Sequence, residues 1–516
     1  MTQVRTGDGP TAPADEPSRE PAGGALAALA GLVAGWAGLA VAWFAAHALS
    51  AKDDPVTAVA EQIIRRVPGG LAEEGIQRLG HHDKPVLVGL VLAFLTAVFV
   101  AVGWLSRRPW APVAGFGALA VVGALAVSAQ PGTGVREELP VAAGFLTWVG
   151  LLAVLRSPLR EPRAYGDGRR FLLQAGVVAA GAAALGAVTP SVGRARRRVE
   201  AARSALRIRG LTKPATPAGA DLGEALPWAT PTGDFYRIDT AITPSYVDPA
   251  GWTLKIHGMV ERPVEVTFED LVARRRTNAW ITLNCVSNEV GGDLIGNAWW
   301  SGVRLRDLLA EAGVQDGADA VLQTSADGWT CGTPMAALTD DRPAILALAM
   351  NGAPLPIEHG FPVRTVVPGL FGYVSACKWV VDLEVTTMSH AVGYWITRGW
   401  AAEGPVKLAS RIDRPRAGAT VPAGRYTVAG VAWEQETGIS KVEVAVDGGA
   451  WREARLGRVP SVDTWVQWAL DVDLRAGDHR VTVRAVDRRG TVQTSVRRDV
   501  VPDGATGWHQ VSFEAS

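Results

Sequence analysis

The residues best suited to redox chemistry are one cysteine and a group of cations downstream of it. Cys285 stands in TLNCVSNEVGG (282–292), after an apolar strand-like run and at the start of a loop. A side chain in that position projects into a cleft. From the spacing alone, a buried and inert thiol is an equally good interpretation of Cys285. The chain has three cysteines, so at least one thiol lacks an internal disulfide partner. A thiolate in a positive environment is a ligand for soft or high-valent metals.

The cations follow in MNGAPLPIEHGFPVRTVVPG (350–369), where His359 and Arg364 stand five residues apart around a proline-containing turn. An arginine beside a histidine is a natural clamp for a phosphate or another anionic group. A purely structural pair is the more common alternative. Lys378 adds a further cation and Ser375 a hydroxyl. One thiol and several cations describe a site for a metal carried on an anionic organic cofactor.

The other two cysteines leave two alternatives open. Cys331 and Cys377 are either buried thiols or partners in a disulfide. The sequence contains no CxxC, no HExxH and no regular His/Cys spacing, so a zinc site is unsupported.

The elements that must position these residues alternate between strand-like and helical patterns. Between 231 and 405, apolar runs are interleaved with short amphipathic stretches such as Arg304–Ala312, which predicts a mixed α+β domain. The expected strands are Trp252–Ile256, Ala279–Leu283, Ala320–Gln323, Val363–Val367 and Trp379–Val385. From Ser410 onward, short alternating runs separated by turns predict an antiparallel β-sandwich. Its expected strands are Tyr426–Val431, Lys441–Val446, Trp465–Leu470, His479–Ala485 and Thr491–Val496.

The first 200 residues have a different character. The 51 Lys and Arg balance 51 Asp and Glu over 516 residues, which gives no case for a nucleic-acid partner. The long uncharged runs all precede Arg194, and most reach the roughly 20 apolar residues that a membrane helix needs. We therefore expect five transmembrane helices, near 24–50, 85–105, 111–130, 139–156 and 171–190. Small residues such as Gly31, Gly35 and Gly38 suit close helix packing in lipid, whereas a buried helical bundle in a soluble protein is the alternative.

Arginines in short loops predict the orientation of these helices. They lie between helices two and three and between helices four and five, at Arg107, Arg108, Arg156, Arg160, Arg163, Arg169 and Arg170. Such loops stay in the cytoplasm, so we expect the 52–84 loop and everything after helix five on the outer face, although the basic cluster 194–198 opposes this. The segment GRRFLLQAG (168–176) is either a twin-arginine export signal or positive-inside charge alone.

These patterns divide the chain into five parts. The predicted parts are a disordered N-terminus (1–23), a five-helix transmembrane anchor (24–190), a linker (191–230), a catalytic domain (231–405) and a β-sandwich (410–516).

Residues 232–405 resemble the molybdopterin-binding domain of the sulfite oxidase family, and 410–516 resemble the immunoglobulin-like domain that follows it in many members. The resemblance rests on TLNCVSNE, on MNGAPLP..HGFPVR.VVPG and on Cys377-Lys378-Trp379. It implies a multidomain fold: an N-terminal all-α transmembrane bundle, an α+β sulfite-oxidase-like molybdopterin domain and a C-terminal immunoglobulin-like β-sandwich. The implied cofactor is Mo-molybdopterin.

The resemblance also implies roles for individual residues. Cys285 corresponds to the thiolate ligand of molybdenum, and His359 and Arg364 correspond to contacts with the pterin phosphate. Asp327, in TSADGW, matches an acidic residue that contacts the pterin. The remaining implied cofactor contacts are Tyr236, Arg237 and, more weakly, Asp239 in DFYRIDTA, and Ser375, Ala376 and Lys378 in the last cofactor-binding turn.

The implied activity is two-electron redox chemistry or oxygen-atom transfer on a small substrate, either a sulfite-like oxyanion or a sulfoxide. Glu289 and Val290 stand where the sulfite oxidases have an arginine pair, which predicts weak binding of a sulfite-sized dianion. A methionine-sulfoxide-reductase-like enzyme and a metal-free membrane-anchored binding or scaffold protein are the alternatives. Trp280, Trp299, Trp300 and Trp329 are candidates for the cavity wall, but ordinary packing is the role we expect for most of them.

Electrons need a partner outside this chain. The membrane half contains only His47, His81 and His82, and haem between helices usually takes histidine ligands. We therefore expect a separate cytochrome or membrane electron carrier, at a cell membrane with the catalytic domain on the extracytoplasmic side. A homodimer is left open as the assembly.

Overall fold

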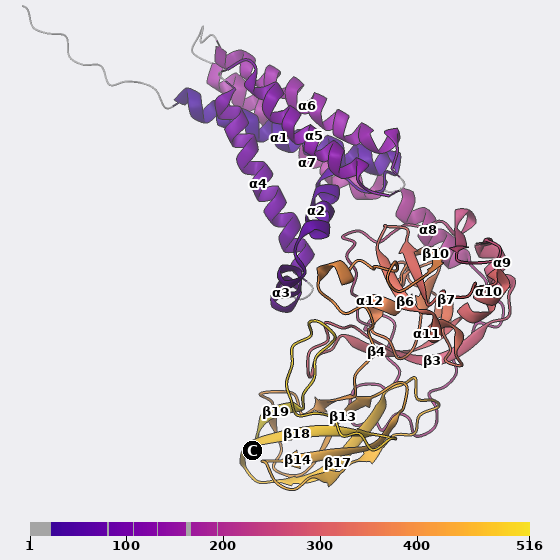
Figure 1. The fold of residues 1–516 in the computed structure, drawn as a ribbon. Helices are drawn as coiled ribbons and strands as arrows, with labels where there is room; N and C mark the ends of the chain where they lie inside the picture. The colour runs from indigo at the N-terminus through magenta and orange to yellow at the C-terminus, as the bar shows by residue number, and fades with distance from the viewer. Residues whose placement is uncertain (1–21, 80–81, 107, 132, 161–166, 193) are drawn as a thin grey trace, which may run out of the picture. The chain divides into compact units, whose positions relative to one another are not determined.

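The computed structural model describes residues 22–79, 82–106, 108–131, 133–160, 167–192 and 194–516 (Figure 1). The chain forms two compact units. The first comprises residues 1–59, 87–128 and 134–192, and the second comprises 60–86, 129–133 and 193–516. The predicted disordered N-terminus lies almost entirely outside the described residues, as do Arg107, Arg163 and His81.

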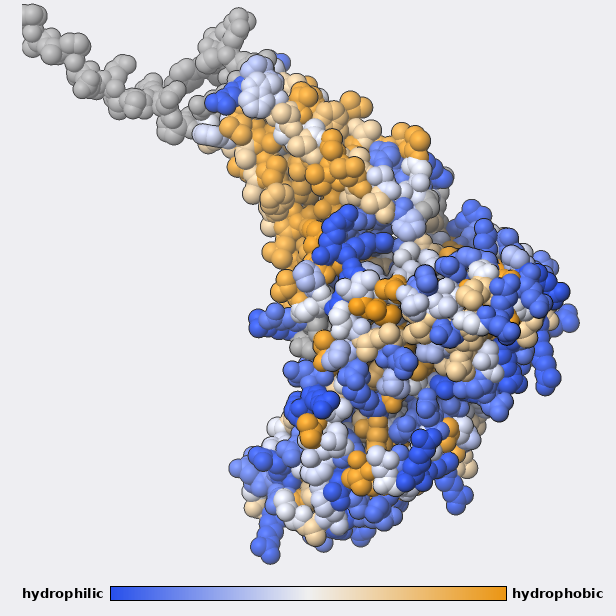
Figure 2. Space-filling view, viewed as in Figure 1, coloured by the Kyte–Doolittle hydropathy of each residue, from blue (hydrophilic) through white to orange (hydrophobic). Residues whose placement is uncertain are grey.

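The first unit is a bundle of long apolar helices. They are α1 (Ala22–Leu49), α4 (Asp83–Leu105), α5 (Ala111–Ser128), α6 (Val135–Arg160) and α7 (Asp167–Val192). Among the described residues, five helices are long and apolar enough to cross a membrane, as the sequence predicts. Large side chains such as Leu90, Phe94, Leu146 and Val177 are exposed on them, and Figure 2 shows a continuous hydrophobic surface over these helices. An apolar surface of this extent indicates contact with lipid or protein.

Close helix packing in this unit depends on glycine, as expected. A Cβ on Gly31 of α1 would collide with the backbone of Gly103 in α4, and one on Gly38 would collide with the Trp148 ring of α6. Trp148 Nε1 donates a hydrogen bond to the carbonyl of Gly35 over 2.8 Å. Small residues at these contacts let the helix backbones approach one another closely.

Two parts of the chain are more ordered than the sequence predicts. The segment after α1 contains helices α2 (Pro55–Arg66) and α3 (Gly69–Leu79), and the expected linker begins with helix α8 (Arg194–Ala205). The rest of that segment belongs to the second unit and packs within it: Trp228 is fully buried, and its Nε1 donates to the carbonyl of Trp465. Residues 206–230 thus follow an irregular but packed course, because apolar side chains without periodicity can still bury themselves.

An α+β domain occupies residues 253–400 of the second unit. One of its sheets has the order β2 (Val264–Thr267), β1 (Thr253–Gly258), β10 (Val380–Thr386), β5 (Ala320–Ser325) and β6 (Thr330–Pro334). The other has β3 (Thr277–Asn284), β4 (Ile295–Arg304), β7 (Ile345–Met350) and β8 (Ala353–Pro354), with β9 (Arg364–Val366) paired to β7. The helices that connect these strands along the chain are α9 (Phe268–Ala273), α10 (Leu305–Ala312), α11 (Met335–Thr339) and α12 (Gly372–Ser375). All five strands expected here are present.

The C-terminal domain consists of two packed sheets. The first contains β11 (Ala409–Arg414), β13 (Gly424–Trp433), β17 (Val466–Leu474) and β16 (Arg455–Leu456). The second contains β12 (Thr420–Val421), β19 (His509–Ala515), β18 (Gly477–Asp487), β14 (Ile439–Val446) and β15 (Arg452–Glu453). The predicted strand Thr491–Val496 is wrong, because Val492 and Val496 are exposed there. The last strand is β19, which the sequence analysis missed although its alternating Val511, Phe513 and Ala515 are buried.

The C-terminal domain is joined to the α+β domain by buried polar contacts. Arg411 pairs with Asp413 and also donates to the carbonyl of Gly292 over 2.8 Å. His509 accepts a hydrogen bond from the backbone N–H of Ile412, and its ring lies against Gly291. Burial, and then the charges of Arg411 and Arg497, lower the pKa of His509 to about 4.

We expect this histidine to make the junction sensitive to acid. Its folded pKa lies below the ordinary value of 6.5, so the unfolded chain binds the extra proton between pH 6.5 and 4, and stability falls as the pH falls through that window. The loss is on the order of 3 kcal/mol, at about 1.4 kcal/mol for each pKa unit. His509→Asn keeps a hydrogen-bond acceptor without titrating, so its thermal unfolding midpoint should depend less on pH from 7 to 4.5 than that of the wild type. Equal pH dependence of the two proteins would contradict this assignment.

Candidate cofactor site

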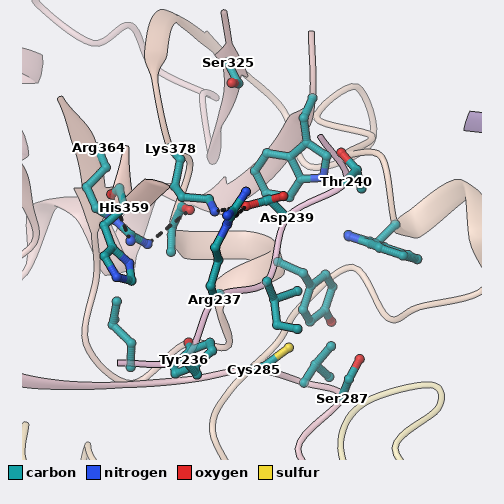
Figure 3. A pocket seen from close by; sticks show the side chains of 18 of the residues that line it. Tyr236, Arg237, Asp239, Thr240, Cys285, Ser287, Ser325, His359, Arg364 and Lys378 are labelled. Atoms are coloured by element: carbon teal, nitrogen blue, oxygen red, sulfur yellow. Dashed lines mark hydrogen bonds and ion pairs between the residues drawn. The ribbon is translucent and has the colours of Figure 1, made fainter. Parts of the chain in front are cut away.

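One cavity gathers side chains from distant parts of the second unit (Figure 3). Its walls come from the stretch 235–240, from the end of β3, from the turn 325–329, from His359 and β9, and from the segment 372–400. Its polar groups come both from loops that follow strands, such as the loop after β3, and from the irregular stretch 235–240 that precedes β1.

Cys285 is the first residue after β3, as the sequence predicts, and its side chain lines the cavity. The loop that follows is fixed by its own hydrogen bonds. The Cys285 N–H donates to the carbonyl of Leu294, and Asn288 Oδ1 accepts from the N–H of Leu294 over 2.9 Å. Asn288 therefore shapes the loop that presents the thiol and does not line the cavity.

Arg364 is a buried cation that lacks a carboxylate partner among the described residues. Its guanidinium makes only long contacts, 3.3 to 3.5 Å, with the carbonyls of His359, Thr365 and Ala376, and it lies 5.3 Å from the centre of the Trp300 ring. Burial lowers the pKa of Arg364 to about 10, which still leaves it charged at neutral pH. A buried charge needs a counter-ion, so this arginine calls for an anionic ligand.

His359 adds a neutral donor or acceptor beside that cation. Burial, and then the charges of Arg364, Lys378 and Arg237, lower its pKa to about 3. The imidazole is therefore uncharged at neutral pH. A neutral imidazole can donate a hydrogen bond to an oxyanion from one nitrogen.

A network of charges forms the next part of the wall. The Lys378 ammonium donates to Asp239 Oδ2 over 2.5 Å, and Arg237 Nε lies 3.1 Å from the same oxygen. Burial alone would raise the pKa of Asp239, but Lys378, Lys84 and Arg237 hold it well below its ordinary value. Burial lowers the pKa of Lys378 to about 8, against the opposing effect of Asp239. The cations outnumber the carboxylate, so this wall is positively charged.

The structure brings the predicted cofactor residues together with one exception. Tyr236, Arg237, Asp239, Cys285, Asp327, His359, Arg364, Ala376 and Lys378 all line the cavity. Ser375 does not, because its fully buried hydroxyl donates to the carbonyls of Leu370 and Phe371 at the start of α12. The Ser375 hydroxyl therefore stabilises the turn that leads into α12.

The wall also contains aromatic side chains that the sequence analysis missed. Trp395, Trp400 and Tyr373 line the cavity together with the expected Trp329. The other three candidate tryptophans do not line it, in keeping with the packing role expected for most of them: Trp280 and Trp299 pack against each other, and Trp300 lies beneath Arg364. Trp280, Trp299 and Trp300 lie in strands β3 and β4, whereas Trp329, Trp395 and Trp400 lie in loops that fold over the cavity.

Two residues that the sequence analysis connects with substrate binding do not line the main cavity. Glu289 and Val290 line a separate, smaller cavity together with Asn288 and Phe371. Their lack of positive charge therefore does not determine which anion the main cavity accepts. Cys331 and Cys377, whose pairing the sequence leaves open, are both fully buried and do not form a disulfide.

The donor set suits a metal that arrives on another group. Within the described ranges of the chain, no cluster of three or more His, Cys, Asp or Glu side chains could hold a metal ion alone. The cavity instead offers one thiol, Cys285, with the buried cations Arg364 and Lys378 on another part of its wall. Such a wall fits an anionic organic cofactor whose metal takes a single protein ligand.

Comparison with known families supports this reading. A family model described as an oxidoreductase molybdopterin binding domain matches residues 240–395, and a Mo-co oxidoreductase dimerisation domain matches 402–515.

Similar proteins include the uncharacterized oxidoreductase YuiH of Bacillus subtilis, 35% identical over 185 residues that make up 35% of this chain and 88% of YuiH. Human mitochondrial sulfite oxidase is 29% identical over 346 residues, which are 56% of this chain and 62% of the human protein. The chain thus spans less than two thirds of the human enzyme. Among solved structures, the sulfane dehydrogenase SoxCD from Paracoccus pantotrophus has a TM-score of 0.49 and 26% identity, covering 59% of this chain and 86% of that one.

Proposed function

Because the chain belongs to the sulfite oxidase family of molybdopterin-binding oxidoreductases, we propose that it oxidises or reduces a small sulfur compound at a membrane surface. Its cofactor is Mo-molybdopterin, which supplies two-electron redox chemistry and oxygen-atom transfer when bound. The proposed substrate is a sulfite-like oxyanion or a sulfoxide.

The observation that carries this proposal is that one cavity has a thiol on one part of its wall and a group of cations on another. Cys285 on one part of the wall acts as the thiolate ligand, and Arg364, His359 and Lys378 bind the phosphate of the pterin on another. The phosphate of the pterin is then the counter-ion of Arg364. Asp239 orients Lys378 through the 2.5 Å contact, and Tyr236 closes the cavity beside Cys285, whose charge, after burial, raises the pKa of the tyrosine.

The remaining wall residues select the substrate. Arg237 is the most exposed cation of the group, with 37% of its side chain accessible, so it can reach a bound oxyanion. The aromatic rings of Trp329, Trp395 and Trp400 favour the alternative, a sulfoxide with apolar substituents, as in a methionine-sulfoxide-reductase-like enzyme.

The variant Arg237→Met separates these two substrate classes. For an oxyanion we expect KM to rise about tenfold to a hundredfold with a smaller change in kcat, because a charged hydrogen bond to the substrate is worth roughly 1.5–3 kcal/mol. For a sulfoxide KM should stay within about threefold. The measurement is steady-state turnover of the metal-loaded protein with sulfite, with a range of sulfoxides and with an artificial electron carrier. Turnover of neither class would contradict the proposed function.

The rest of the chain determines where the enzyme is located and with which partners it works. We propose that α1 and α4–α7 anchor the enzyme in a cell membrane with the second unit on the extracytoplasmic side. A separate cytochrome or membrane carrier exchanges the electrons. The C-terminal domain is proposed to be an immunoglobulin-like sandwich that pairs two copies of the chain, as the dimerisation-domain match supports.

A further inference from the structure

The segment 60–86, between the first two apolar spans, belongs to the same compact unit as the cavity. It contacts the loops that carry the cavity wall. Arg65 Nη2 donates to the carbonyl of Asp327 over 2.6 Å, and the Tyr394 hydroxyl donates to the carbonyl of Ile64. Arg398 also donates to the carbonyl of Arg65.

The same segment reaches a second part of the wall. Lys84 Nζ donates to Asp239 Oδ1 and to the carbonyl of Ala241, both over 2.6 Å. Close by in the same loop, the backbone N–H of Ile242 donates to Glu61 Oε1 over 3.2 Å. The segment 60–86 therefore contacts the loop 239–242, whose residues Asp239 and Thr240 line the cavity.

The two oxygens of Asp239 have different partners. Oδ1 accepts from Lys84, whereas Oδ2 accepts from Lys378 and Arg237. The carboxylate is only 5% exposed, so water cannot replace a lost partner freely. Removing Lys84 would leave a buried carboxylate oxygen without its cation and free the side chain to turn away from Lys378.

We propose that Lys84 is a positioning residue of the cofactor site, through which the segment 60–86 completes the cavity and keeps Asp239 aligned with Lys378. The inference rests on the proposed function, since its consequence is retention of an anionic cofactor by Lys378 and Arg364. It gives the segment 60–86 a direct part in building the site.

The test is the rate at which the full-length, detergent-solubilised protein releases pterin, followed by fluorescence, together with molybdenum content per chain. Lys84→Met should release pterin about tenfold faster than the wild type, and Lys84→Arg should restore most of the difference. Arg78→Met is the matched control, because Arg78 is 76% exposed and pairs only with Glu74 among the described contacts. It should behave as the wild type.

A double-mutant cycle distinguishes positioning from a general loss of stability. If Lys84 acts through Asp239, Asp239→Asn releases pterin faster, and adding Lys84→Met causes little further change. Wild-type release from Lys84→Met, or effects that multiply in the double variant, would overturn the inference while leaving the proposed function intact. A wild type that carries no pterin would instead defeat the proposed function itself.

Discussion

Replacing Cys285 by serine should reduce turnover at least about a thousandfold without unfolding the protein. A serine hydroxyl stays protonated near neutral pH, so it cannot replace a thiolate as the ligand of a high-valent metal. The side chains are nearly equal in volume, and Cys285 lies at the cavity wall, so the thermal unfolding midpoint should change little. Turnover is measured per molybdenum atom, and the absorption band from thiolate-to-metal charge transfer should disappear with it.

Cys331→Ser is the matched control for this substitution. Cys331 is fully buried in β6 and does not line the cavity, so this variant should keep turnover per molybdenum within about twofold and show its effect in stability. Near-normal turnover in Cys285→Ser, or equal losses in the two variants, would show that Cys285 is not the metal ligand.

The second large effect is expected from Arg364→Met, which should lower pterin retention at least about a hundredfold. The guanidinium is buried, has no carboxylate partner among the described residues and makes only long contacts with carbonyl oxygens, so its charge is available to the cofactor phosphate. Removing one member of a buried charge pair costs roughly 2–5 kcal/mol. Dissociation of fluorescent pterin from the purified variant measures the loss.

Two variants make the interpretation of Arg364→Met specific. Arg364→Lys keeps the charge without the planar fork, so its retention should be intermediate. Arg306→Met removes a surface arginine of α10, which pairs with Asp307 and Asp341, and should leave pterin retention unchanged. Full retention in Arg364→Met would remove this arginine from the cofactor site.

The sequence predicts the parts of this molecule that depend on local pattern. The five apolar helices follow from uninterrupted runs without charge, and the strand before Cys285 follows from a short apolar run that ends in a loop. The cavity residues are recognisable because three short motifs keep the order and spacing of a known family. Ser375 shows the limit of that argument, since a motif gives its position but not the direction of its hydroxyl.

Other features depend on contacts between distant segments. Lys84 stands 155 residues before Asp239, and no local pattern links a lysine near the start of an apolar helix to a carboxylate in the cavity. Trp395 and Trp400 are likewise indistinguishable from packing residues until the loop that carries them is folded. The ordered course of residues 206–230 was missed because burial of Trp228 needs a partner from the C-terminal domain.

The central claim is that this cavity holds a molybdenum cofactor, and metal analysis of the purified full-length protein tests it most directly. The protein should be isolated from cells that make molybdopterin. We expect close to one molybdenum atom and one pterin per chain in the wild type, and a large loss of both in Arg364→Met. A wild type that contains neither, although the cells supply the cofactor, would contradict the account and favour a metal-free membrane-anchored binding or scaffold protein.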